Sequence, residues 1–132
     1  FNYNIGSLPE RRIVSVEVSP ERHHMYEVQG YYLHTNHYLE LSDVAQEITP
    51  SSRRRLERAG SLCRSTPPDD ATRVLALLGD RADRDYPIHC NATPPDINAT
   101  LCSALFDLDN HQLRIYWDNP VREPEKYIQL AL

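Results

Sequence analysis

Apolar and polar residues alternate in several short runs of this chain, a pattern that predicts β-strands with one buried face. Residues 12–18 alternate in this way near the start of the chain. Residues 25–28 and 31–35 flank Gln29-Gly30, and this spacing predicts a hairpin with Gly30 in its turn. The three runs together predict a continuous antiparallel meander.

Two central segments carry apolar residues at helical spacing instead. Thr49 and Pro50 are suited to the N-cap and first turn of a helix, and the start signals Pro67-Pro68-Asp69-Asp70 precede a second helix that Gly79 ends. The apolar face of the first helix consists of Leu56, Ala59 and Cys63. The stripe of the second helix consists of Ala71, Val74, Leu75 and Leu78. Both segments therefore predict helices with one face packed on the rest of the chain.

Strand patterns return in the last third of the sequence. Residues 80–98 carry three prolines and many charges, which predicts a long loop. Residues 100–107 and 112–117 are typical of a strand and its return strand, and residues 127–132 predict an edge or terminal strand. Strands, two helices and strands again predict an α+β layered structure.

Composition and charge narrow the function classes. With 40% apolar and 25% charged residues the chain is typical of globular proteins, and 132 residues make one domain at most. A net charge of −5 argues against a nucleic-acid binder, for which a basic footprint is expected. No apolar stretch approaches the ~20 residues of a bilayer span. We therefore predict no nucleic-acid partner and no membrane span.

The cysteines and two glycosylation sequons bear on compartment. Cys90 and Cys102 can pair in an oxidising compartment, whereas Cys63 is left over. Asn91 and Asn98 each begin an Asn-Ala-Thr sequon and are the predicted glycosylation sites of a secreted form. The sequence does not choose between a secreted or lysosome-like compartment and the cytoplasm.

None of the three cysteines is predicted to act as a nucleophile, which requires a nearby base and positive surroundings. Cys63 and Cys102 have apolar neighbours typical of a core, and Cys90 is expected to be the most exposed. The histidines predict no metal site, because His34 and His37 would point to opposite faces of a strand. We predict no cofactor.

The segment Thr35-Asn36-His37 carries the most interesting polar chemistry. At the end of a strand, the Asn36 amide is positioned to stabilise the oxyanion of an acyl-transfer reaction; alternatively, Asn36 caps a turn. Ser52 is followed by three arginines, and guanidinium groups bind carboxylates. Arg53, Arg54 and Arg55 point about 100° apart on a helix, so they cannot all face one site, and a solvated basic face is the alternative.

These segments, in their order, resemble the acyl-coenzyme A:6-aminopenicillanic acid acyltransferase family, which includes enzymes similar to carcinine hydrolase. The resemblance rests on the stretches at residues 1–6, 12–20, 28–39, 51–59, 85–88 and 100–108. It covers nearly the whole chain, residues 1–132, but only the C-terminal part of the family's domain.

The resemblance implies a four-layer αββα N-terminal-nucleophile hydrolase fold, of which this chain supplies antiparallel strands and two central helices. It implies autocatalytic processing of a zymogen, which exposes a cysteine at the start of a companion chain in a heterodimer. That cysteine attacks an amide or thioester of a small acyl substrate, with its own α-amino group as base.

The resemblance also assigns roles to residues of this chain. Asn36 matches the family's oxyanion-hole asparagine, and Ser52 with Arg55, or else Arg53, matches a serine–arginine segment near the active site. His37 and Tyr38 are expected to contact the substrate.

The chain begins with Phe1, so the nucleophile is expected outside it. Two hypotheses compete with an enzyme subunit. One is a non-catalytic binding or structural module that kept the scaffold, and the other is recognition of an acidic ligand by the arginine cluster alone.

Overall fold

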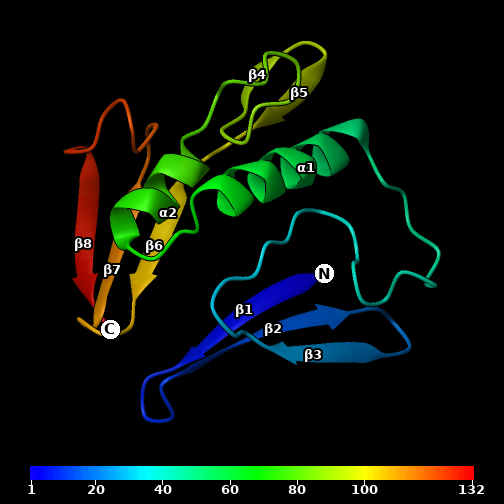
Figure 1. Cartoon of the computed structure of the whole chain (residues 1–132), viewed down its shortest axis with the longest axis horizontal. Coiled ribbons are helices and arrows are strands. Elements are labelled where there is room, and N and C mark those ends of the chain that lie inside the picture. Colours follow the sequence, from blue (N-terminus) through cyan, green and yellow to red (C-terminus); the bar gives the residue numbers. More distant parts are fainter.

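The computed structural model describes residues 1–132 and places one three-stranded sheet on either side of a helical segment in the sequence (Figure 1). The first sheet has the antiparallel order β1-β2-β3, formed by β1 (Asn2–Ser7), β2 (Arg12–Val18) and β3 (His23–Glu27). An antiparallel meander exists, but only the predicted runs 12–18 and 25–28 contribute to it, and its other strand is β1, which was not predicted.

The predicted strand over residues 31–35 is wrong. The chain does bend at Gly30, which adopts φ 72°, but residues 28–49 then follow an irregular path without pairing to β3. The physical reason lies in the backbone hydrogen bonds of this segment. The N–H groups of Asn36 and Tyr38 donate to the side chains of Ser52 and Gln46 rather than to a neighbouring strand. Asn36 therefore lies in a loop and not at a strand end.

Both predicted helices are confirmed. Helix α1 (Pro50–Ser65) begins after Thr49, whose hydroxyl accepts a hydrogen bond from the Ser52 N–H at 3.2 Å. Helix α2 (Ala71–Leu78) begins after Asp70 and ends at Gly79. The ion pairs Arg54–Asp83 (2.9 Å) and Arg58–Asp80 (2.8 Å) connect α1 to the segment that follows α2.

The predicted loop over residues 80–98 is only partly correct. It contains a small hairpin formed by β4 (Asn91–Thr93) and β5 (Asp96–Ala99). Pro94 and Pro95 form the connection between these strands, so the residues that indicated a loop in fact make a hairpin turn. In Figure 1 helix α1 lies between this hairpin and the first sheet.

The last sheet is antiparallel in the order β6-β7-β8, with β6 (Ser103–Asp107), β7 (Gln112–Tyr116) and β8 (Tyr127–Ala131). Its strands confirm the pattern seen in the sequence, and α2 packs against β6 (Figure 1). The α+β class with antiparallel sheets and two helices is thus confirmed. Neither helix has the length and apolar character needed to span a bilayer.

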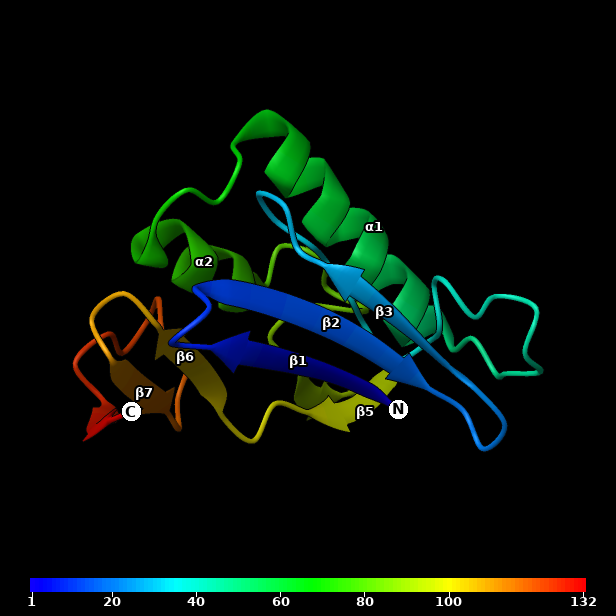
Figure 2. The same ribbon diagram turned by 90° about the horizontal axis from the view of Figure 1, so that it is seen from below.

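Both sheets leave an apolar face open. Strand register puts Tyr3, Ile5 and Met25 on one face of the first sheet, and they are 53%, 57% and 62% exposed. Register in the last sheet similarly groups Phe106, Ile128 and Leu130, at 58%, 48% and 49% exposed. Viewed from below, the two sheets lie side by side under the helices (Figure 2). Soluble monomeric proteins rarely leave a group of large apolar side chains this exposed.

The cysteines differ from expectation. Cys63 is buried as predicted, but Cys90 is buried and Cys102 is exposed, the reverse of what their neighbours indicated. Cys90 donates its thiol to the Pro87 carbonyl at 3.2 Å, and β6 begins only after Cys102. All three thiols are free, so no Cys90–Cys102 bridge is present.

Candidate active site at the Asn36 loop

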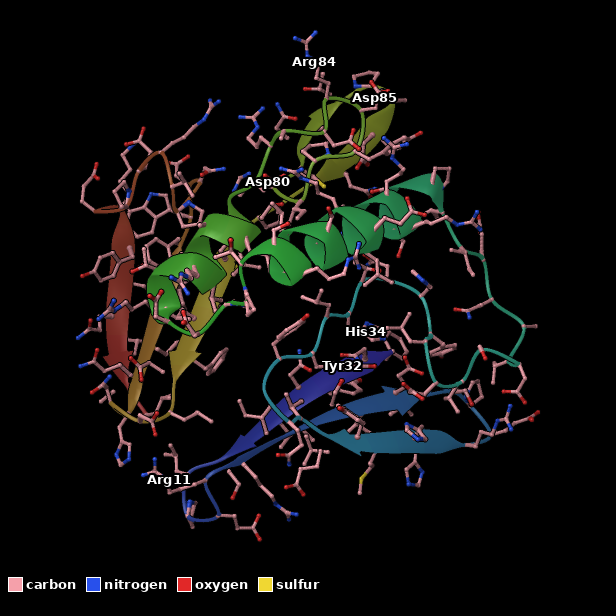
Figure 3. All side chains as sticks on the ribbon, viewed as in Figure 1. Arg11, Tyr32, His34, Asp80, Arg84 and Asp85 are labelled. Atoms are coloured by element: carbon pink, nitrogen blue, oxygen red, sulfur yellow. The ribbon has the colours of Figure 1, made fainter.

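Residues 34–41, here called the Asn36 loop, lie between the first sheet and α1. Figure 3 shows His34 in this space, with Tyr32 beside it and Arg11 far away at the turn between β1 and β2. The loop has no regular secondary structure. Its shape is set instead by side chains from β2 and α1, which reach it from opposite sides.

Ser52, in the first turn of α1, holds the middle of the loop. Its Oγ accepts from the Asn36 N–H at 2.9 Å, donates to Thr35 Oγ1 at 3.0 Å and lies 2.7 Å from His37 Nδ1. The side chain is only 1% exposed. Ser52 therefore organises the loop from beneath and cannot itself reach a substrate.

Arg55, one turn further along α1, fixes the orientation of the Asn36 amide. Arg55 Nη2 donates to Asn36 Oδ1 at 2.6 Å. A guanidinium has only donors, so the amide oxygen must face it and the Asn36 Nδ2 must face away. No group of the chain hydrogen-bonds that nitrogen, and the residue is exposed. A rigidly aimed N–H donor is thus available to a ligand.

Arg55 is itself held by a second set of contacts behind it. Its Nε donates to Ser51 Oγ at 3.2 Å, and Ser51 donates to the buried Asp96 carboxylate at 2.6 Å. Asp96 also accepts from both the backbone and side-chain nitrogens of Asn98, at 3.1 and 2.6 Å. The β4–β5 hairpin thereby supports the arginine that orients Asn36.

The other two arginines of the cluster do not join this site. Arg54 points to Asp83, and Arg53 is exposed without a hydrogen-bonded partner. Of the two arginines that the sequence left open, only Arg55 contacts Asn36. The prediction that the cluster cannot converge on one site agrees with this geometry.

His34 and His37 contact different elements: His34 Nε2 lies 2.7 Å from Glu17 Oε1 on β2, and His37 Nδ1 lies 2.7 Å from Ser52 Oγ on α1. Burial lowers the pKa of His37 below its usual value, and the nearby His34 and Arg53 lower it further. His37 is therefore neutral at pH 7. The Tyr38 hydroxyl donates a hydrogen bond to the Val18 carbonyl at 2.8 Å, so this hydroxyl is bonded to the end of β2.

A hollow of about 610 Å³ opens in front of the loop. It is lined mostly by polar side chains: Phe1, Asn2, Asn4, His34, Thr35, Asn36, His37, Tyr38, Ala45, Gln46 and Glu47. A smaller and more apolar hollow of about 300 Å³ lies behind the loop and is shared by His34, Thr35 and Arg55. The loop therefore separates a polar space from an apolar one.

The predicted glycosylation sites lie elsewhere. Asn91 and Asn98 are exposed on the β4–β5 hairpin. Asn98 is engaged by Asp96, whereas the Asn91 side chain makes no hydrogen bond.

Comparison with known families shows which family this chain matches. The sequence profile of the acyl-coenzyme A:6-aminopenicillanic acid acyl-transferase family matches residues 1–122. The chain belongs to this family. Membership of the acyl-transferase family indicates an enzyme with acyltransferase- or hydrolase-type chemistry. Searches of curated proteins and of solved structures gave no significant match.

One residue of this candidate site was not found from the sequence. Glu17, on β2, is 2% exposed, and its carboxylate contacts the Asn36 loop. The alternation of residues 12–18 places Ser15 and Glu17 on the polar face, where a glutamate is normally solvated. No local signal distinguishes a solvated glutamate from one buried beneath a distant loop.

Proposed function

We propose that this acyl-transferase family member is part of a cysteine-type N-terminal-nucleophile amidohydrolase or acyltransferase acting on small N-acyl amides, peptide-like conjugates or thioesters. The observation that supports this most directly is the Asn36 amide, whose free N–H is aimed into a hollow by Arg55. Such a donor stabilises the oxyanion that forms when a nucleophile adds to a carbonyl.

The reaction proposed for this site follows ordinary acyl-transfer chemistry. The cysteine thiol gives its proton to its own α-amino group as sulfur adds to the carbonyl carbon. Asn36 Nδ2 donates to the oxygen that gains charge. The tetrahedral adduct then expels the amine or thiol, which takes up the proton, and leaves an acyl-thioester on the enzyme. Water or an acceptor amine removes the acyl group and restores the thiol.

The thiol is proposed to come from a companion chain. Cys63 and Cys90 are buried, and Cys102 lines the hollow behind the loop rather than the one in front. Burial also raises the pKa of Cys90 and of Cys63, which opposes thiolate formation. The open apolar faces of both sheets offer surfaces on which such a chain can pack to complete four layers.

The lining of the hollow in front of the loop indicates which part of the substrate it can hold. An N-acyl amide has an apolar acyl part and a polar amine part on either side of its carbonyl. The polar hollow, which Asn36 also lines, is suited to the amine part.

The proposal is tested by Asn36→Ala in the full-length protein, with hexanoyl p-nitroanilide and hexanoyl-coenzyme A as probes. We expect kcat to fall by about 10²–10³-fold with KM little changed, because the donor acts mainly on the transition state. Asn91→Ala is the matched control, since this asparagine is exposed on β4, makes no side-chain hydrogen bond and lines neither hollow. Equal turnover by wild type and Asn36→Ala would remove Asn36 from the mechanism.

Intact mass spectrometry of every chain in the active preparation tests the source of the thiol. A partner whose first residue is cysteine supports the two-chain enzyme. A preparation without such a partner, and without turnover of either probe, supports instead a non-catalytic module on this scaffold.

A further inference from the structure

Glu17 is a charged side chain buried in the middle of β2, at 2% exposure. Its two carboxylate oxygens make four contacts with the Asn36 loop. Oε1 accepts from the Leu39 N–H at 2.6 Å and lies 2.7 Å from His34 Nε2. Oε2 accepts from the N–H groups of Glu40 and Leu41, at 3.0 and 2.9 Å.

These contacts bracket the part of the loop that faces the hollow. His34 lies at its first residue, and the three backbone donors lie at its end. Thr35, Asn36, His37 and Tyr38 stand between the two groups. Ser52 holds the middle of this stretch from α1, so Glu17 and Ser52 together fix the loop from opposite sides.

The four contacts require a carboxylate. An ionised glutamate accepts hydrogen bonds at both oxygens. The isosteric glutamine has an NH2 group in place of one oxygen, and this group would face two N–H donors of the loop. An apolar residue would leave three N–H groups of the loop without this acceptor, including the buried one of Leu41, which is costly. An ionised group buried at this depth is tolerated only when it is satisfied in this way.

We propose that Glu17 is a positioning residue, which acts through the Asn36 loop to hold the Asn36 amide in register with the reacting carbonyl. This inference rests on the proposed function of Asn36. It adds a residue that contacts no substrate and whose effect passes entirely through the loop.

The ionisation of Glu17 agrees with this role. Burial pushes its pKa up, but hydrogen bonds from Leu39, Leu41, His34 and Glu40 outweigh that effect, so the pKa lies below its usual value. The carboxylate therefore remains charged, and the loop remains held, at neutral and weakly acidic pH.

The test is a double-mutant cycle between Glu17→Gln and Asn36→Ala in the full-length protein, with hexanoyl p-nitroanilide as probe. We expect Glu17→Gln alone to lower kcat by about tenfold or more and to change KM by less than about twofold. In the Asn36→Ala background we expect Glu17→Gln to lower kcat by less than about twofold. Loss of one oxyanion donor leaves measurable turnover, so the double variant can be assayed.

Glu21→Gln is the matched control, because Glu21 is exposed in the turn after β2 and makes no hydrogen bond. It should match wild type. A Glu17→Gln variant with normal kcat overturns the proposal. So does one that lowers kcat by the same factor with and without Asn36, since a general loss of structure would act in both backgrounds.

Failure of the positioning role and failure of the proposed function are distinguishable. Unchanged turnover by Asn36→Ala contradicts the proposed function, whatever Glu17→Gln does. Should Glu17→Gln fail to fold, Glu17→Asp keeps both acceptor oxygens but retracts them by one methylene. The same cycle with this variant then decides: an effect present only when Asn36 is intact supports positioning, and an effect equal in both backgrounds contradicts it.

Discussion

The Arg55 guanidinium sets the orientation of the Asn36 amide, because a guanidinium can only donate hydrogen bonds. Arg55 makes two kinds of contact at once, with Asn36 on the solvent side and Ser51 on the helix side. The planar fork of an arginine permits this, whereas the single ammonium of lysine does not. The rotation of one side-chain amide therefore depends on a residue that does not itself face the hollow in front of the loop.

Arg55→Lys should accordingly lower kcat by about tenfold or more and leave KM nearly unchanged, because the Asn36 amide loses its fixed orientation. Steady-state kinetics with hexanoyl p-nitroanilide measure both constants. Arg53→Lys is the control, since Arg53 is exposed and contacts neither Asn36 nor Ser51. Equal losses in the two variants would contradict a specific role for Arg55.

At the scale of elements, the β4–β5 hairpin and α1 are joined through a buried carboxylate. Asp96 is 4% exposed and accepts hydrogen bonds from Ser51 and from Asn98. The hairpin is short, so it needs an attachment to a larger element to be stable. Asp96 provides that attachment directly behind Arg55.

Asp96→Ala should lower the free energy of unfolding by about 1–3 kcal/mol, the cost of leaving buried donors without an acceptor. Urea unfolding followed by circular dichroism measures this. Asp85→Ala is the matched control, because Asp85 is exposed and its carboxylate makes no hydrogen bond. A change of the same size in both variants would argue against the attachment.

The same hairpin carries both sequons, and we propose Asn91 as the modified one in a secreted form. Its side chain is free, whereas Asn98 donates to Asp96 at 2.6 Å. Expression through a secretory route followed by deglycosylation should give one gel shift that Asn91→Gln abolishes and Asn98→Gln does not. A shift that persists in Asn91→Gln contradicts this assignment.

Periodicity predicted the elements whose hydrogen bonds are local or regular, and it failed where distant side chains supply them. Strands β2 and β7 and both helices follow from alternation, caps and stripes in their own residues. The Asn36 loop has strand-like residues, but Glu17 and Ser52 capture its N–H groups from other elements. Spacing alone also could not bring Asn36, Ser52 and Arg55 together; the family resemblance indicated that grouping.

For the whole molecule, buried and paired carboxylates set the response to acid. Burial raises the pKa of Glu17 and Asp96, but the hydrogen bonds they accept outweigh it and leave each pKa below its usual value. The pKa of Asp80 is lowered mainly by Arg58. Each group therefore stabilises the fold above its unfolded pKa of about 4, and this contribution is lost as pH falls through the lower folded value.

The free energy of unfolding should consequently decrease as pH is lowered below about 4.5. Urea titrations across this range measure the slope. Asp80→Asn removes one contributor, so its difference from wild type should shrink toward the acid end, whereas Glu21→Gln should follow wild type throughout. A pH-independent difference for Asp80→Asn would show that its pairing with Arg58 does not drive the effect.

The open sheet faces set a second property of the whole molecule. If the companion chain packs on the face formed by Tyr3, Ile5 and Met25, Met25→Lys should weaken assembly by placing a charge in an apolar contact. Size-exclusion chromatography with light scattering measures the assembled fraction. Gln29→Lys adds the same charge just beyond β3 and should assemble normally. Normal assembly of Met25→Lys would place the contact elsewhere.

The pairing of Arg55 with the oxygen of Asn36 also has a consequence for how such a protein ages. Hydrolysis of the Asn36 amide releases ammonia and leaves an aspartate. Its negative charge would lie next to the Arg55 guanidinium, which already contacts this side chain. The damaged molecule would be no less stable than before, yet it would have lost its only outward N–H at that position. Thermal unfolding would not distinguish such a sample from the intact protein. Mass spectrometry would detect the change in mass, and an activity assay would detect the loss of turnover.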